Sequence, residues 1–128
     1  MHYPLFARVG AAAWGAYHAA HNARITMLVG PWMLGELCCA GALLLVAPPE
    51  RRLWAVAAAA GVGVAWASTA LLSVPLHGRL AGGLDLDQVD ALVATNWVRT
   101  LAWTARGLLL GAWLWRELER GSGLELVE

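Results

Sequence analysis

The chain has 128 residues, which suits a single domain, and its formal net charge is zero because nine basic residues balance nine acidic ones. Charged residues make up 14% and hydrophobic residues 59% of the sequence, whereas ordinary soluble domains have about 25% and about 45–50%. So few charges cannot cover the surface of a small soluble fold, and no basic excess points to a nucleic-acid partner. The composition predicts an all-α protein, an integral membrane helix bundle whose main partner is the lipid bilayer.

The first predicted helix covers residues 5–22, which are apolar but rich in Ala and Gly. Four ring-bearing residues recur at helical spacing on one of its faces, namely Trp14, Tyr17, His18 and His21. Such a segment is typical of a helix that lies at a membrane surface. We expect a shorter amphipathic N-terminal helix, partly in the bundle and partly among the lipid headgroups.

The second and third predicted helices cover residues 25–47 and 52–76. The second has one charge, Glu36, near its middle, and the third has none after its first residue. About 20 apolar residues cross the hydrocarbon core of a bilayer, so both helices are long enough to span it. Two adjacent prolines separate them, and Pro75 is expected to stop or kink the third.

The fourth predicted helix covers residues 88–117 and follows a short acidic stretch. Acidic side chains favour a helix N-terminus, and Asp87 is the expected N-cap. Two tryptophans near the end of this helix are typical of the aromatic belt at a membrane surface. The sequence therefore predicts three strong transmembrane helices beside the shorter N-terminal one. We expect a single domain over residues 1–120 and a flexible tail over residues 121–128.

Arginines indicate which way the chain crosses the membrane. If the three strong spans alternate, one side carries four arginines and the other carries three. The side with four has Arg51, Arg52, Arg116 and Arg120. Because basic residues accumulate on the cytoplasmic side of membrane proteins, we expect a multi-pass protein whose C-terminus lies in the cytoplasm.

Three charged side chains fall inside the predicted spans, namely Glu36, Arg99 and Arg106. Charge in a membrane helix is costly, so such residues usually face a bundle interior and meet a partner. One stripe of the last helix contains Asn96, Arg99, Trp103 and Arg106. We expect Glu36 to pair with one of the two arginines. The pair is either structural, fixing helix register, or part of a functional site.

Three histidines are candidate metal ligands. His18 and His21 share a helix face, and alternation of the spans brings His77 to the same end. Their nitrogens could bind zinc or copper, or supply haem ligands. The alternative is that they bind water, lipid headgroups or backbone carbonyls at the membrane surface. The sequence identifies no cofactor, and it contains no phosphate-binding loop or nucleophile elbow that would identify a catalytic residue.

These polar residues define a candidate pocket toward one membrane face. Arg99 could hold an anionic or carbonyl-bearing small molecule, and a histidine could move a proton. The expected pocket residues are Tyr17, His18, His21, Glu36, His77, Asn96, Arg99, Trp103 and Arg106.

Several stretches together resemble a known family. They are His2-Tyr3-Pro4-Leu5-Phe6, then Tyr17-His18 with His21 and Arg24, then Val74-Pro75-Leu76-His77 with Arg79-Leu80, and Asn96-Trp97 with Arg99-Thr100, Trp103 and Arg106. The pattern covers nearly the whole chain and is similar to small bacterial integral membrane proteins with four helices and no established activity. Relatives have an additional hydrophobic helix before the first stretch, and by this resemblance that helix is absent here. The resemblance implies a place in the bacterial cytoplasmic membrane.

A more distant similarity is to the anthrone-oxygenase-like membrane family. That family also has four short helices, with an Asn and an Arg in the last one. Here Asn96 and Arg99 lie in the predicted last helix. The similarity rests on architecture and these few polar residues.

Three hypotheses of function follow. The first is a small bacterial membrane protein of unassigned biochemical function with a polar His/Asn/Arg pocket at one membrane face. The second is an enzyme, either a membrane oxidoreductase or a cofactor-independent oxygenase of the anthrone-oxygenase-like type. The third is a carrier or an accessory subunit of a membrane complex, whose partners would be a second copy or other membrane helices.

Overall fold

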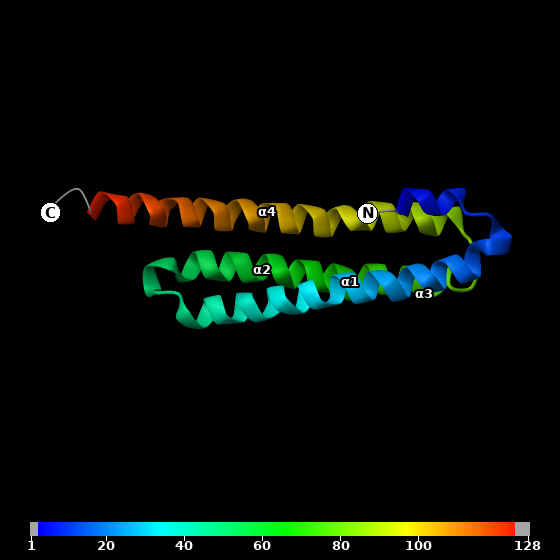
Figure 1. Cartoon of the computed structure of the whole chain (residues 1–128), viewed down its shortest axis with the longest axis horizontal. Helices are drawn as coiled ribbons and strands as arrows, with labels where there is room; N and C mark the ends of the chain where they lie inside the picture. Colours follow the sequence, from blue (N-terminus) through cyan, green and yellow to red (C-terminus); the bar gives the residue numbers. More distant parts are fainter. Residues whose placement is uncertain (1–2, 125–128) are drawn as a thin grey trace.

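A computed structural model describes residues 3–124, and these residues form helices joined by short connections, with no strand among them. Three long helical rods lie roughly side by side (Figure 1). The helices, in chain order, are the 3-10 helix η1 (Tyr3–Arg8), α1 (Ala11–Val46), the 3-10 helix η2 (Pro49–Arg51), α2 (Arg52–Ser68), the π-helix η3 (Thr69–Ser73), α3 (Val74–Leu80) and α4 (Leu86–Leu124). Since α2, η3 and α3 follow one another without a break, they form a single rod. The predicted all-α class is confirmed.

The N-terminal half of the fold differs from the prediction. The sequence predicts separate helices over residues 5–22 and 25–47, whereas the structure has η1 followed by one helix, α1. No glycine or proline lies at the expected break, and polar side chains alone do not stop a helix. Pro31 lies inside α1 and does not end it. A separate short amphipathic helix is therefore absent from the described residues.

Two of the rods are long and apolar enough to cross a membrane. They are Ala11–Val46 and Pro49–Leu80, and each contains an 18-residue stretch with a mean hydropathy of 1.7. At 1.5 Å per residue, the 36 residues of α1 reach about 54 Å, which exceeds the ~30 Å hydrocarbon core of a bilayer. The sequence predicts three strong spans, but the third, which lies in α4, is not apolar enough over its described residues to count as a candidate span. Asn96, Arg99 and Arg106 lower the hydropathy of its middle.

The start of α4 is capped by a different aspartate from the one predicted. The Oδ1 atom of Asp85 accepts hydrogen bonds from the backbone N–H groups of Asp87 at 3.0 Å and Gln88 at 3.2 Å. Asp87 is already inside the helix, which begins at Leu86, two residues before the predicted start. The helix also continues through residues 121–124 of the expected flexible tail, while residues 125–128 lie outside the described residues.

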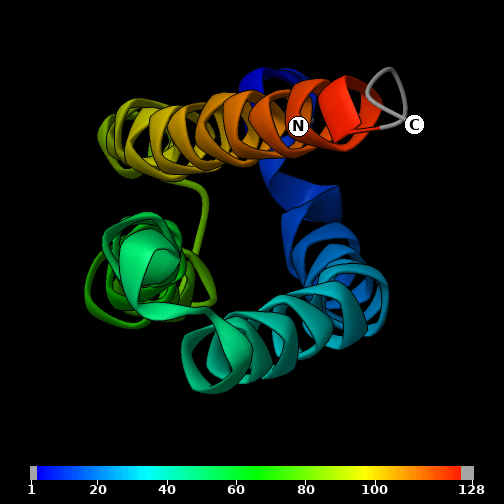
Figure 2. The same cartoon turned by 90° about the vertical axis from the view of Figure 1, so that its left-hand side faces the viewer.

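The central rod holds the other two together. The α2 helix packs against both α4 and α1, and the end-on view shows α1 beginning near α4 and ending further from it (Figure 2). Small side chains let α2 approach its neighbours closely, because Ala55, Ala58 and Ala65 are fully buried. At Gly61 an added Cβ would lie 3.2 Å from the Cβ of Arg106, so a larger residue there would press on the α2–α4 contact.

The main hydrophobic core lies at the end of the molecule where α1 and α4 begin. It consists of Phe6, Trp14, Leu80, Val89 and Leu92, and η1 folds back against α4 to bring Phe6 into it. The indole Nε1–H of Trp14 donates a 2.7 Å hydrogen bond to the carbonyl oxygen of Leu80. That carbonyl belongs to the last residue of α3, where helix carbonyls lack an intrahelical partner. Trp14 therefore fixes α3 to the start of α1.

Candidate functional site

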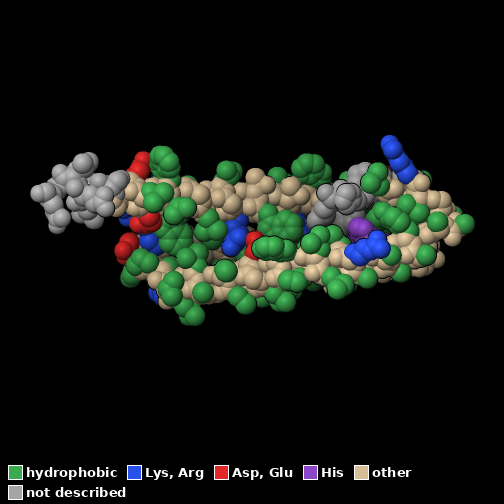
Figure 3. Space-filling model, in the orientation of Figure 1, with side chains coloured by type: hydrophobic (Ala, Val, Ile, Leu, Met, Phe, Trp, Pro, Cys, Tyr) green, Lys and Arg blue, Asp and Glu red, His purple; other side chains and the backbone are tan. Residues whose placement is uncertain are grey.

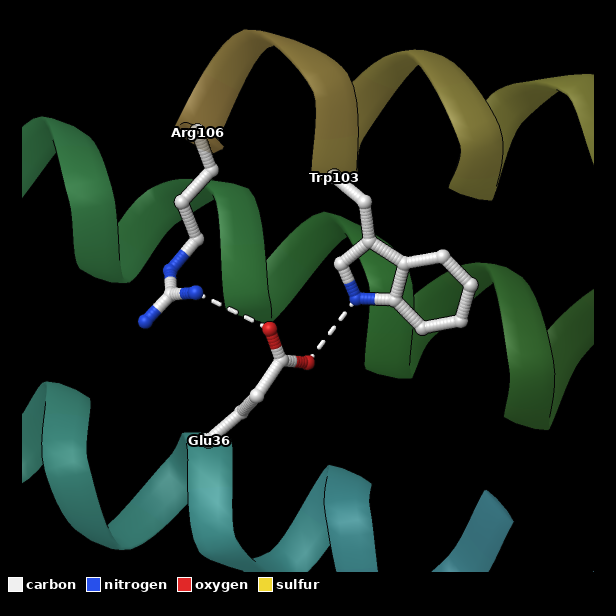
Figure 4. Close-up of polar contacts among 3 residues, drawn as sticks. All are labelled: Glu36, Trp103 and Arg106. Atoms are coloured by element: carbon white, nitrogen blue, oxygen red, sulfur yellow. Dashed lines mark hydrogen bonds and ion pairs between the residues drawn. The ribbon is translucent and has the colours of Figure 1, made fainter. Parts of the chain in front are cut away.

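An ion pair joins α1 to α4 near the middle of the molecule (Figure 4). Arg106 Nη1 lies 2.9 Å from Glu36 Oε1, and Trp103 Nε1 donates a 2.9 Å hydrogen bond to Glu36 Oε2. The side chains of Arg106 and Glu36 are 14% and 28% exposed. The expected pairing of Glu36 with an arginine is confirmed, and the partner is Arg106. Because both carboxylate oxygens accept a hydrogen bond, the charge of Glu36 is well compensated.

Arg99 lies in a different environment, seven residues earlier on the same face of α4. It is 5% exposed. Its Nη2 donates to Asn96 Oδ1 at 2.8 Å, and its Nη1 donates to Thr69 Oγ1 at 3.4 Å. The side chains of Asn96 and Thr69 are neutral, and Asn96 lies one turn away on the same helix. The guanidinium is therefore held by α4 itself and directed toward η3.

The π-helical turn at η3 gives Arg99 its second contact. The N–H of Val74 donates to the carbonyl of Thr69, five residues back, so the helix is locally wider than an α-helix. Pro75 follows at once, and a proline ring clashes with the carbonyl four residues before it in a regular helix. A wider turn relieves that clash. Thr69 begins this turn, and its hydroxyl donates to the carbonyl of Ala65 at 2.8 Å. Its oxygen remains available to accept from Arg99.

Histidines connect α1 to α3 at the end of the molecule that holds the main hydrophobic core. His18 Nε2 and His77 Nδ1 share a hydrogen bond of 3.3 Å, and the amide nitrogen of Asn22 lies 3.4 Å from the same nitrogen of His18. The ring of His18 stacks on Trp14 with centroids 5.2 Å apart. Phe6 meets the ring of His21 edge-on at 4.7 Å. The rings are thus fixed by packing as well as by hydrogen bonds.

The three histidines that the sequence offers as metal ligands do lie close together. The ring centroid of His77 is 5.5 Å from that of His18 and 6.2 Å from that of His21. Within residues 3–124, however, no group of three or more His, Cys, Asp or Glu side chains is arranged to hold a metal ion. His18 and His77 direct ring nitrogens at each other instead of at a common point.

A cavity of about 640 Å³ lies between α1 and the α2–η3–α3 rod, with Arg99 of α4 at its inner side. This volume is within the range of about 300–1,000 Å³ that small-molecule sites occupy. The residues that line it are Asn22, Ile25, Thr26, Val29, Gly30, Met33, Leu34, Trp66, Thr69, Ser73, Val74, His77, Gly78, Ala81 and Arg99. Most are apolar, and a few polar groups converge from three helices, which is the usual composition of a ligand site.

The buried polar atoms Trp66 Nε1 and Ser73 Oγ belong to this lining, and neither has a hydrogen-bond partner among the described residues. An unsatisfied buried donor costs about 1–3 kcal/mol, and in native proteins such groups are usually satisfied by water or a ligand. The cavity therefore offers hydrogen-bond donors that the protein itself does not use.

The structure distributes the nine predicted pocket residues among three places. His77 and Arg99 line the cavity of about 640 Å³, with Asn96 and His18 holding them in place. Tyr17 and His21 line a smaller hollow on the outer side of α1. A third hollow, between α1 and α4, is lined by Glu36, Trp103 and Arg106.

Sequence reasoning missed Trp66, Thr69 and Ser73 as pocket residues. The spacing of Thr69, Ser73 and His77, at i, i+4 and i+8, was an available signal, because it puts all three on one helix face.

Comparison of the chain with protein-family models, with curated proteins and with solved structures gives no match in any of the three. A function can therefore be inferred only from the arrangement of these side chains.

Proposed function

We propose that this chain is an integral membrane protein that binds a small molecule carrying an anionic or carbonyl group in the cavity around Arg99. The first support is the nature of its surface. Met27, Leu45 and Leu53 are 79%, 87% and 78% exposed, and hydrophobic side chains cover much of the surface between charged ends (Figure 3). Large exposed apolar surfaces are rare on soluble monomers and are expected where lipid surrounds a protein.

The second support is the depth of the charged residues. Arg51 and Glu117 form an ion pair at one end of the molecule, where Arg116 also lies 5.1 Å from the ring centroid of Trp54. Charged and aromatic residues of this kind gather at membrane surfaces. Eighteen residues of α4 separate Glu117 from Arg99, which is about 27 Å at 1.5 Å per residue. A bilayer core is about 30 Å thick, so Arg99 belongs near the opposite surface.

The same arithmetic puts the Arg106–Glu36 pair near the middle of the bilayer. Eleven residues separate Arg106 from Glu117, or about 17 Å. A charge is most costly there, and the carboxylate of Glu36 compensates the charge of Arg106. The end that carries Arg51 would face the cytoplasm by the distribution of arginines. With the resemblance described above, this favours a multi-pass protein of the bacterial cytoplasmic membrane.

The observation that carries the binding proposal is a buried guanidinium at the edge of a cavity. Arg99 is 5% exposed, is oriented by Asn96 and Thr69, and lines the cavity. A guanidinium binds carboxylate and carbonyl oxygens with directed, charge-assisted hydrogen bonds. Ionisable residues inside membrane proteins are costly, which makes each of them a candidate for a functional site.

A catalytic form of the proposal is favoured by one further contact. His77 lines the same cavity as Arg99, and its Nδ1 shares a hydrogen bond with His18. A histidine beside a bound carbonyl compound is suited to accept or donate a proton. The corresponding activity is a cofactor-independent oxygenase acting on an aromatic substrate. Oxygen uptake with a polycyclic hydroxyaromatic compound, present in the wild type and lost in His77→Gln, would support it.

The binding proposal is tested in two steps. The protein should stay in the membrane fraction after alkaline carbonate extraction. In detergent, benzoate should then raise the thermal unfolding midpoint of the wild type, and benzylamine should not. Arg99→Gln should abolish the benzoate effect, whereas Arg79→Gln, which removes the same charge from an exposed position of α3, should retain it. Extraction by carbonate would refute the membrane assignment, and an undiminished benzoate effect in Arg99→Gln would refute the site.

A further inference from the structure

The cavity around Arg99 is amphiphilic along its length. Glu36 and Arg106 are in contact, and α1 and α4 run in the same direction (Figure 1). Seven residues back along each helix, Val29 and Arg99 therefore lie at the same level. From Val29 the wall of the cavity continues along α1 to Leu34, about 8 Å further toward the level of the ion pair. Polar groups surround one part of the cavity, and this deeper part is apolar.

The side of the cavity is open between α1 and the α2–η3–α3 rod. Leu34 on one wall and Val74 on the other are both exposed apolar residues of its lining. In a bilayer these residues face lipid. A molecule dissolved in the membrane could therefore enter sideways without passing through water.

The polar part of the cavity offers donors to its occupant. Arg99 contributes the formal positive charge, and the described lining residues include no Asp or Glu. Trp66 Nε1 and Ser73 Oγ add two buried groups that have no hydrogen-bond partner among the described residues. Ser73 is 3% exposed, so water from the bulk does not reach its side chain freely. Two of these three groups, the guanidinium and the indole, can only donate. The head group of a complementary ligand is therefore a hydrogen-bond acceptor, and the positive charge of Arg99 favours an anionic one.

We propose that the ligand is a single-chain carboxylate of the fatty-acid class that enters from the lipid. Its carboxylate lies against Arg99, with Ser73 and Trp66 as further donors along the cavity, and its chain follows the apolar wall of α1 toward Leu34. This inference rests on the proposed function, because it names the class of molecule that occupies the same cavity. It adds that the molecule comes from the bilayer and that its chain is recognised as well as its head.

Glycines in the lining allow the cavity to be filled without disturbing the fold. An added Cβ at Gly30 or Gly78 would meet no protein atom within 4 Å, and both residues line the cavity. Gly30→Leu should therefore occupy the space of the chain. Gly35 lies on the same helix with equally open surroundings but does not line this cavity, so Gly35→Leu is the matched control.

The test uses the full chain in phospholipid vesicles and dodecanoate with a photoreactive diazirine at the end of its chain. After irradiation, mass spectrometry of peptides locates the label. Because the extended chain is longer than the wall from Val29 to Leu34, label should concentrate on α1 at Leu34 and in the turns that follow it, and excess dodecanoate should remove it while dodecylamine should not. Loss of a charge-assisted hydrogen bond lowers affinity about tenfold or more, so Arg99→Gln should reduce the label by that factor at limiting probe. Gly30→Leu should reduce it comparably, and Gly35→Leu should leave it unchanged.

The outcomes separate this inference from the function on which it rests. If excess benzoate removes the label as well as dodecanoate does, the ligand is a small soluble anion, and the chain-recognition inference is overturned while the anion site stands. Equal competition by dodecylamine, or equal labelling of the lipid-facing Met27 and Leu45, also overturns it. If neither carboxylate competes and the label is the same in Arg99→Gln, both the inference and the proposed function are refuted. Because Gly30→Leu retains every polar group, it remains informative should Arg99→Gln fail to fold.

Discussion

The ion pair between Glu36 and Arg106 makes the sharpest prediction about stability. Replacing Glu36 by Gln keeps the size of the side chain and an oxygen that can accept from Trp103, but it removes the negative charge. Arg106, whose side chain is 14% exposed, would then keep its positive charge among apolar neighbours. Breaking a buried pair in this way costs about 3–5 kcal/mol. Because the amide oxygen still accepts a hydrogen bond and Glu36 is itself 28% exposed, we expect a loss of about 3 kcal/mol in the free energy of unfolding.

A double-mutant cycle isolates the pairwise part of this effect. Arg106→Gln alone should cost a similar amount, since it leaves the carboxylate of Glu36 without its cation. The double variant should be about as stable as the worse single variant, and because each single change costs about 3 kcal/mol, this corresponds to a coupling energy of about 3 kcal/mol. The measurement is the unfolding of purified protein by dodecyl sulfate in mixed micelles, followed by tryptophan fluorescence and circular dichroism. A second double-mutant cycle, with Glu36→Gln and Arg99→Gln, is the control, and the effects of its two changes on the free energy of unfolding should add.

Two results would refute this reasoning. A silent Glu36→Gln change would mean that the charge of Arg106 is compensated elsewhere or lies in water. A coupling between Glu36 and Arg99 as large as that between Glu36 and Arg106 would mean that the carboxylate is shared between the two guanidinium groups.

Two further changes test the packing of the rods. Gly61→Leu should lower the free energy of unfolding by about 1–3 kcal/mol, because even its Cβ would lie 3.2 Å from a side chain of α4. Gly63→Leu on the same helix is the control: a Cβ added there meets no protein atom within 4 Å, so this change should not destabilise the protein. Trp14→Phe should cost at least about 1 kcal/mol through loss of the bond to the Leu80 carbonyl, whereas Trp97→Phe, at an exposed position, should cost little. Thermal unfolding in detergent measures all four variants. Equal unfolding midpoints for the two glycine variants would contradict the close α2–α4 contact, and equal midpoints for the two tryptophan variants would contradict the hydrogen bond from Trp14 to the Leu80 carbonyl.

Hydrophobic length and turn residues made the helical class predictable. The adjacent prolines after α1 end that helix, as predicted, because proline cannot continue it. The predicted break near residue 23 is wrong for a related reason, since the polar residues there contain no helix breaker. A run of polar residues indicates where a helix meets a polar environment, and only glycine, proline or a cap indicates where it ends. The N-cap prediction is also wrong: several aspartates precede α4, and their composition does not tell which of them caps the helix.

The grouping of the polar side chains was only partly predictable. Spacing along α4 correctly put Asn96, Arg99, Trp103 and Arg106 on one face. Which arginine meets Glu36 depends on how far α1 is displaced along α4, and nothing in a single sequence encodes that displacement. The π-helical turn was equally hidden, although Pro75 marks the place where a regular helix is strained.

The two arginines of α4 have the same chemistry but different tasks because they lie at different depths. They are seven residues, or about 10 Å, apart on one face of the helix. In the proposed membrane, Arg106 is near the centre, where an uncompensated charge is most costly, and there Glu36 neutralises it. Arg99 is near the surface, where the cost is smaller, and the neutral side chains of Asn96 and Thr69 orient it. The arginine that borders the cavity therefore lies at a depth where its charge is less costly.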